Sequence, residues 1–92
     1  MTMTEEATKI CTRVVAKINA VSVKGMGGDE DVWKATTPAH DIFWEALIKW
    51  EAEGGDDNKA ALREAAKDWI GAWREASVEY QAKLANEFNR GS

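Results

Sequence analysis

The chain has 92 residues, a formal net charge of −4 and an apolar fraction of 45%, which together predict one small globular domain. No apolar run is long enough to cross a membrane, and one cysteine excludes an internal disulfide framework. The first residues lack the basic and apolar parts of a signal peptide, so we expect a cytoplasmic protein.

The first predicted helix covers residues 5–23. Thr4 is a suitable N-cap, and Glu5 and Glu6 follow in the first turn, where the helix dipole favours acids. Apolar residues then recur at steps of four and three, which is the spacing of one buried helical face. This face contains Ala7, Cys11, Val14, Ile18 and Val21.

A glycine-rich segment, residues 25–28, follows this helix and predicts a connector. Glycine-rich loops can bind phosphate, but Asp29, Glu30 and Asp31 come next and would repel it. Residues 29–35 can form a short helical turn that packs Trp33 inward.

The second predicted helix covers residues 38–53. Thr37 is a favourable N-cap and Pro38 suits the first helical position, so both residues mark a helix start. We expect Trp44 and Ile48 to lie beside the buried stripe and to remain partly exposed. The stripe itself contains Ile42, Phe43, Ala46, Leu47 and Trp50.

The third and longest predicted helix covers residues 58–89 and is interrupted by one glycine, Gly71. It would span roughly 48 Å, whereas a compact domain of this size is only about 30 Å across. The helix must therefore bend at Gly71, extend beyond the body, or be covered by a partner such as a second copy of the chain. Its apolar stripe contains Leu62, Ala65, Ala66, Trp69, Trp73, Ala76, Tyr80, Leu84 and Phe88.

These elements predict an all-α fold, a small three-helix bundle with the helices in the order short, short, long. A homodimer through the long C-terminal helix is the favoured oligomer. At Gly71 we expect glycine to relieve crowding between Trp69 and Trp73, which flank it in the same helix.

Basic residues form two rows at helical i,i+4 spacing, one in the first helix and one near the start of the third. The rows are Lys9, Arg13 and Lys17, and Lys59, Arg63 and Lys67. Either they are solvated faces, or they dock onto acids of this chain (Asp29–Asp31, Asp56 and Asp57) or of a partner.

No motif predicts catalysis, a metal site or a cofactor. His40 is the only histidine and Cys11 the only cysteine, and neither has a metal ligand at helical spacing. We read His40 as a surface residue and Cys11 as a structural thiol. Residues 25–58 carry a net charge of −7, which disfavours a nucleic-acid partner.

Five tryptophans in a chain of this length are the feature most indicative of function. We expect Trp50, Trp69 and Trp73 inside and one or two tryptophans, Trp44 first and Trp33 second, at least half exposed. The leading hypothesis is a small adaptor, inhibitor or assembly factor, such as a phage or mobile-element accessory protein. It would bind another protein through Trp33 and Trp44, with a rim of Asp29, Glu30, Asp31, Glu45 and Glu51. The alternative is a small-molecule pocket walled by Phe43, Trp50, Trp69 and Trp73.

Overall fold

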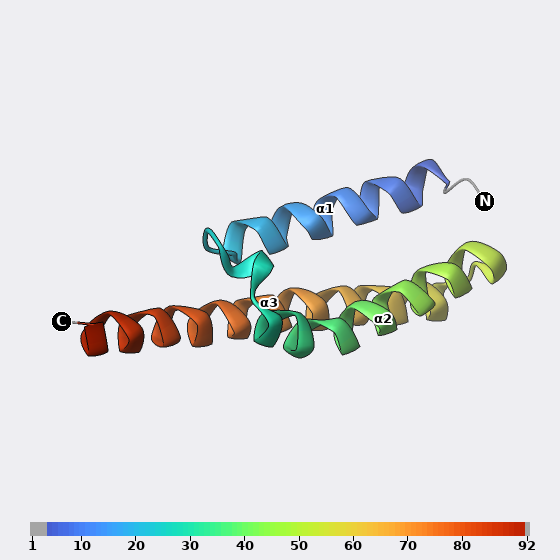
Figure 1. Ribbon diagram of the computed structural model, residues 1–92. Coiled ribbons are helices and arrows are strands. Elements are labelled where there is room, and N and C mark those ends of the chain that lie inside the picture. The colour runs from blue at the N-terminus through green and yellow to red at the C-terminus, as the bar shows by residue number, and fades with distance from the viewer. Residues whose placement is uncertain (1–3, 92) are drawn as a thin grey trace.

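The computed structural model describes residues 4–91 and shows an all-α, three-helix bundle (Figure 1). Residues 1–3 and 92, at the ends of the predicted domain, lie outside this range. The order of elements is α1 (Glu5–Val21), a 3-10 turn η1 (Met26–Gly28), α2 (Glu30–Glu53) and α3 (Asp56–Gly91). The helices have 17, 24 and 36 residues, and the last is the longest, as predicted.

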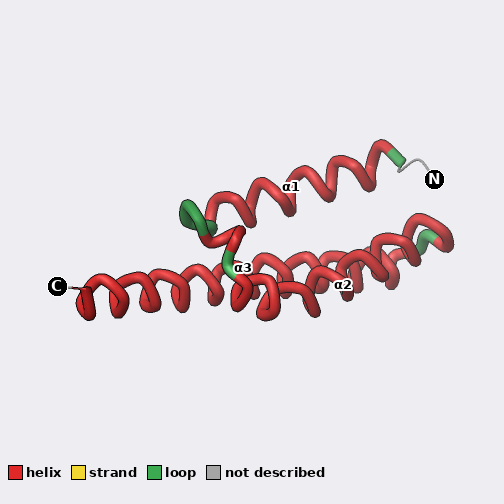
Figure 2. The backbone as a smooth tube through the Cα atoms, viewed as in Figure 1, coloured by secondary structure: helices red, strands yellow, loops and turns green. Residues whose placement is uncertain are grey.

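The helices pack around α3, with α2 antiparallel to it and α1 running in the same direction as α3 (Figures 1 and 2). Their apolar faces meet in one main core, to which each helix contributes. The most deeply buried large side chains in it are Phe43 and Leu47 of α2 and Leu62 of α3, each 1% exposed. The buried residues of this core are Ala7, Val14, Ile18, Phe43, Leu47, Leu62 and Ala65.

Helix α1 begins where the capping pattern predicted. The Thr4 side chain accepts a hydrogen bond from the Ala7 backbone N–H at 3.2 Å, which satisfies one of the free donors at the helix start. The Thr4 backbone N–H donates to Glu51 of α2 at 3.2 Å, so the start of α1 is also tied to the end of α2.

Helix α2 starts eight residues before the predicted position, and the predicted turn at 29–35 is part of it. Asp29 is the true N-cap, because its side chain accepts from the N–H groups of Asp31 and Val32. Pro38 therefore lies inside the helix, where it removes one backbone hydrogen bond. The predicted start at Thr37 is wrong, since the Thr37 hydroxyl instead donates to the Trp33 carbonyl one turn earlier, at 2.6 Å.

The buried face of α2 also differs from the prediction at Ile42, which is 58% exposed. Burial follows Val32, Thr36, Phe43 and Leu47, whose steps of four and seven keep them on one side of the helix. Ile42 precedes Phe43 by one residue, so it points about 100° away from this face.

Helix α3 runs without interruption through Gly71 and makes the fold elongated. The molecule measures 56 × 19 × 19 Å, and a helix of this length accounts for the long dimension, at about 54 Å. Residues 81–90 are all exposed, including Leu84 and Phe88 of the predicted stripe. Within residues 4–91, no helix combines the length and apolar character needed to span a bilayer.

Gly71 does not relieve crowding, contrary to the prediction. A Cβ atom placed on it would meet no neighbouring atom within 4 Å. The side chains of Trp69 and Trp73 therefore leave open space beside it.

The glycine-rich connector between α1 and α2 folds into a turn with its own small core. Gly25 has φ +92°, which favours glycine, and a Cβ there would lie 3.1 Å from the Tyr80 hydroxyl of α3. Met26 is 1% exposed and packs with Val32 and Ala76. This turn fixes the beginning of α2 against the middle of α3.

Candidate functional site

Three large side chains are exposed along one side of α2. Trp33 is 54% exposed, Trp44 is 44% exposed and Ile48 is 51% exposed. Trp44 and Ile48 are one turn apart, and Trp33 lies three turns before Trp44 on the same side. We call these three residues the aromatic face of α2. Trp33 is more than half exposed, as expected, whereas the exposure of Trp44 falls slightly short of the expected half.

The two tryptophans of this face differ in how firmly they are held. The Trp33 indole N–H donates to the Gly27 carbonyl, and its ring packs edge-on against Trp73 of α3 at 6.3 Å. Among the described residues, the aromatic ring contact of Trp44 is with the exposed ring of His40, with 6.4 Å between ring centroids. Trp33 therefore has a structural role in holding η1 and α2 against α3, whereas the ring contact of Trp44 stays within α2.

Most acids of the predicted rim form ion pairs or hydrogen bonds with other residues of this chain. Asp29 and Asp31 both contact Lys83 of α3, at 2.9 and 3.6 Å. Glu30 pairs with Lys34 at 3.3 Å, and Glu51 accepts from Thr4 (above). Among the described residues, Glu45 makes no ion pair or side-chain hydrogen bond.

The ion pair between Asp29 and Lys83 joins the start of α2 to α3. The hydrogen bond from Lys83, together with the N–H groups of Val32 and Asp31, lowers the pKa of the Asp29 carboxyl. The same hydrogen bond and the negative charge of Asp29 raise the pKa of Lys83. Both shifts favour the charged pair near neutral pH.

The residues proposed to wall a small-molecule pocket pack together in the core. Phe43 stacks on Trp69 at 5.2 Å, and Trp50, Trp69 and Trp73 are each partly buried against the core cluster. None of these four residues lines the groove between α1 and α3. The Trp73 indole N–H is buried without an acceptor among the described residues.

Cys11 and His40 lie apart, on α1 and α2. Cys11 is partly buried against the core, and burial together with the nearby Glu51 carboxylate raises the pKa of its thiol. His40 is exposed, contacts Asp41 at 3.1 Å and packs edge-on against Trp69 at 5.2 Å. Among residues 4–91, no three histidine, cysteine or acidic side chains are close enough together to hold a metal.

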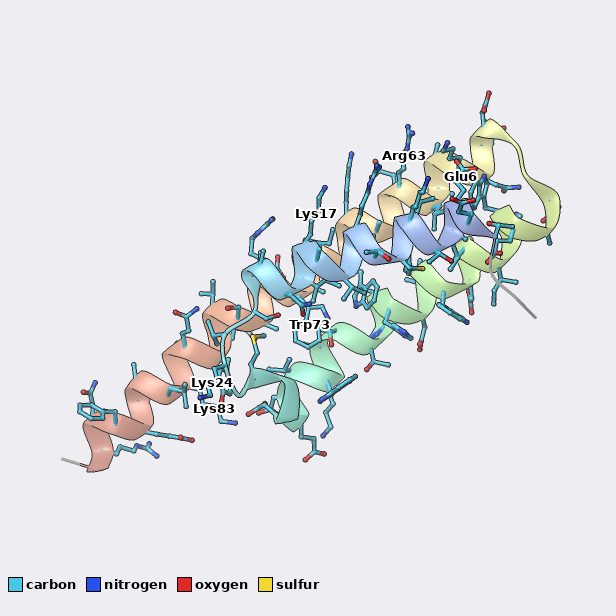
Figure 3. All side chains as sticks on the ribbon, turned by 90° about the horizontal axis from the view of Figure 1, so that it is seen from above. Glu6, Lys17, Lys24, Arg63, Trp73 and Lys83 are labelled. Carbon is cyan, nitrogen blue, oxygen red and sulfur yellow. The ribbon has the colours of Figure 1, made fainter. Side chains whose placement is uncertain are left out.

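The structure brings the two basic rows of the sequence together along a groove between α1 and α3. Its volume is about 470 Å³, and we call it the basic groove. Figure 3 shows Lys17 of α1 and Arg63 of α3 on the same edge of the molecule, with Trp73 on the other side of α1. The groove is lined by Glu6, Lys9, Ile10, Arg13, Val14, Lys17, Lys59, Leu62, Arg63, Ala66, Lys67 and Ile70.

The register of α1 on α3 explains why both rows reach the groove. Glu6 of α1 pairs with Lys59 of α3 at 3.1 Å, and the two helices run in the same direction. Each position of α1 therefore lies beside the position of α3 roughly 53 residues later, which places Arg13 next to Ala66 and Lys67. Both rows repeat every four residues, so they remain together along the groove.

The acids that approach the basic rows are not those expected. Asp29 and Asp31 are engaged with Lys83, and neither Asp56 nor Asp57 makes an ion pair among the described residues. The basic rows contact Glu5, Glu6 and Glu64 instead.

Two parts of the candidate surface were not predicted as sites. Ile48 belongs to the aromatic face, and its spacing of four residues from Trp44 is a signal for this. The basic groove contains Arg13, Lys17 and Arg63. The i,i+4 spacing of the two basic rows is the sequence signal that each row lies on one side of its helix. Their meeting depends on the packing of α1 against α3, which periodicity does not specify.

Comparisons of the chain with protein-family models, with curated proteins and with solved structures give no match.

Proposed function

We propose that this protein is a small protein–protein interaction module that binds its partner through the aromatic face of α2. The observation that carries the proposal is the exposure of Trp44 and Ile48, which lie one turn apart and leave about half of each side chain in solvent. Exposed tryptophans at the centre of an apolar patch are frequent anchors of protein interfaces.

The contacts of Trp44 support this role. The adjoining side of α2, roughly 100° around the helix, supplies the core through Phe43 and Leu47, so α2 is held in place without Trp44. The ring of Trp44 stacks on His40, which is itself exposed, and a partner could cover both rings. An aromatic side chain left this free contributes more to binding than to folding.

The acidic rim has a smaller role than the sequence predicted. Asp29 and Asp31 hold α2 to α3 through Lys83, so changing them would disturb the fold. Glu45 is the rim acid that makes neither an ion pair nor a side-chain hydrogen bond among the described residues, and it would act mainly on the rate and selectivity of binding.

The decisive experiment places a photoreactive amino acid at position 44 or at position 42 and illuminates the protein in an extract of its native host. Ile42 is a matched control, because it is 58% exposed on another side of α2. We expect one protein to be crosslinked from position 44 and not from position 42.

Alanine variants then test the energetics. Trp44→Ala should weaken capture of that protein at least about tenfold, which corresponds to the loss of one anchoring side chain. Its melting temperature should remain close to that of wild type, as should that of Ile42→Ala. A large loss of stability in Trp44→Ala, or equal capture by both variants, would refute the proposal.

A further inference from the structure

The basic groove concentrates positive charge on an acidic protein. Six cations and one carboxylate line it, a formal charge of +5, whereas the whole chain carries −4. The remainder of the chain therefore carries −9. Such a separation of charge steers partners of one sign towards one surface.

Half of these cations have no carboxylate partner. Lys9, Lys59 and Lys67 contact Glu5, Glu6 and Glu64 at 3.8, 3.1 and 3.4 Å. Among residues 4–91, no carboxylate lies within 4.0 Å of Arg13, Lys17 or Arg63. These three side chains are exposed and come from both walls of the groove.

The floor between the two rows is apolar. It consists of Ile10, Val14, Leu62, Ala66 and Ile70, of which Val14 and Leu62 are buried and the other three remain partly exposed. The α3 wall, from Lys59 to Ile70, is roughly 16 Å long, or about three helical turns. An apolar strip of this length between two parallel helices has the shape that a further helix of a bundle would fill.

We infer that the basic groove binds an acidic amphipathic helix of a partner protein, which lies along α1 and α3 as a fourth helix. Its apolar face would cover Ile10, Ala66 and Ile70. Carboxylates on both edges of that face, at i,i+4 spacing, would pair with Arg13 and Lys17 on one wall and Arg63 on the other. This surface is separate from the aromatic face of α2, so an experiment that refutes one of the two proposals leaves the other unaffected.

Charge and shape favour an acidic helix over a nucleic acid. The groove lining contains no aromatic side chain on which a base could stack. The charge of −9 on the remainder of the chain would also repel the phosphates that flank a bound segment. An acidic helix presents its charge on the edges of an apolar face, where the groove has its cations.

The test uses the full chain and a fluorescent synthetic peptide of about three heptads, with leucine at the a and d positions and glutamate at e and g. A second peptide has lysine at e and g, and a third has serine at a and d. Binding is measured by anisotropy at about 50 mM and about 300 mM sodium chloride. We expect saturable binding of the first peptide alone, weakened by salt.

Two triple variants make the measurement specific to the groove. Arg13, Lys17 and Arg63 are replaced by glutamine in the first variant. Lys24, Lys49 and Arg74 are replaced by glutamine in the control, which changes the net charge equally at exposed positions outside the groove. The first variant should bind the acidic peptide at least about tenfold more weakly, and the control within about twofold of wild type.

Several outcomes would overturn the inference. The first is the absence of saturable binding of the acidic peptide. The second is an equal loss of affinity for that peptide in both triple variants. The third is binding of the serine peptide as tightly as the acidic leucine peptide. Tighter binding of a single-stranded oligonucleotide or of phosphatidylglycerol vesicles than of the peptide would assign the groove to phosphates instead. Light scattering that shows a dimer abolished only by the groove variant would assign it to a second copy of this chain.

Discussion

Replacing Gly71 with alanine should stabilise this protein, although the residue lies between two tryptophans in the centre of the longest helix. Glycine in a helix interior costs about 0.5–1 kcal/mol relative to alanine, because it loses more conformational freedom on folding. The added methyl group would meet no atom within 4 Å. The full gain in helix propensity should therefore appear as stability.

The expected gain is measurable by thermal unfolding. For a domain of this size, about 0.5–1 kcal/mol raises the melting temperature by about 2–8 °C. Circular dichroism at the helical minimum would follow the transition, and urea unfolding would give the free energy independently. Ala61→Gly is a matched control in the same helix at an exposed position, and it should lower stability by a similar amount.

A lower melting temperature in Gly71→Ala would refute this reasoning. It would mean that the methyl group meets other atoms in solution, either because α3 bends there or because another chain packs against it. Measuring the effect at several protein concentrations separates these explanations, since only a contact with a second copy depends on concentration.

The remaining predictions concern the C-terminal part of α3. Asp29→Asn should lower the melting temperature near neutral pH, because it removes the charged pair with Lys83. Since the pKa of Asp29 is lowered in the folded state, this pair contributes stability above the ordinary aspartate pKa. The difference in melting temperature between wild type and Asp29→Asn should therefore disappear as the pH falls through the lowered pKa of Asp29. A difference that stays constant with pH would contradict this prediction. Further along the same helix, we expect the exposed part of α3 to form a homodimer at high protein concentration, and Phe88→Ala to return it to a monomer. The melting temperature of Phe88→Ala should equal that of wild type at low concentration, where both are monomers, and should lose the rise with concentration that the dimer gives wild type. Phe88 is 78% exposed, and light scattering that shows a monomer at every concentration would exclude this dimer.

The sequence predicted the helices whose signals agree with one another. In α1, the Thr4 cap and the apolar spacing of Ala7, Val14 and Ile18 indicate the same helix and the same buried face. In α3, one apolar stripe without a proline predicted a long continuous helix. Where local propensity, capping and periodicity coincide, tertiary packing has little to change.

Helix α2 shows why other features of the fold, namely a helix start and a buried face, could not be predicted from the sequence. Thr37 and Pro38 form a strong local start signal, but Asp29 caps the helix earlier, and Val32 and Thr36 become buried when that first part packs against α3. Burial of these side chains outweighs one backbone hydrogen bond lost at the proline. A local signal contains no information about that packing, so the helix start and the orientation of Ile42 were both predicted wrongly.

The basic groove depends in the same way on information that periodicity lacks, namely the register of α1 on α3. That register buries Val14 and Leu62, and it necessarily brings the flanking positions of both helices together. In helical bundles, flanking positions on neighbouring helices commonly carry opposite charges, which select the pairing. Here both helices present cations, which repel one another by a few tenths of a kcal/mol per close pair. Glu5, Glu6 and Glu64 balance three of these cations, and the charge of the other three is left without a carboxylate among residues 4–91. This uncompensated charge is the reason to look for an acidic partner at this groove.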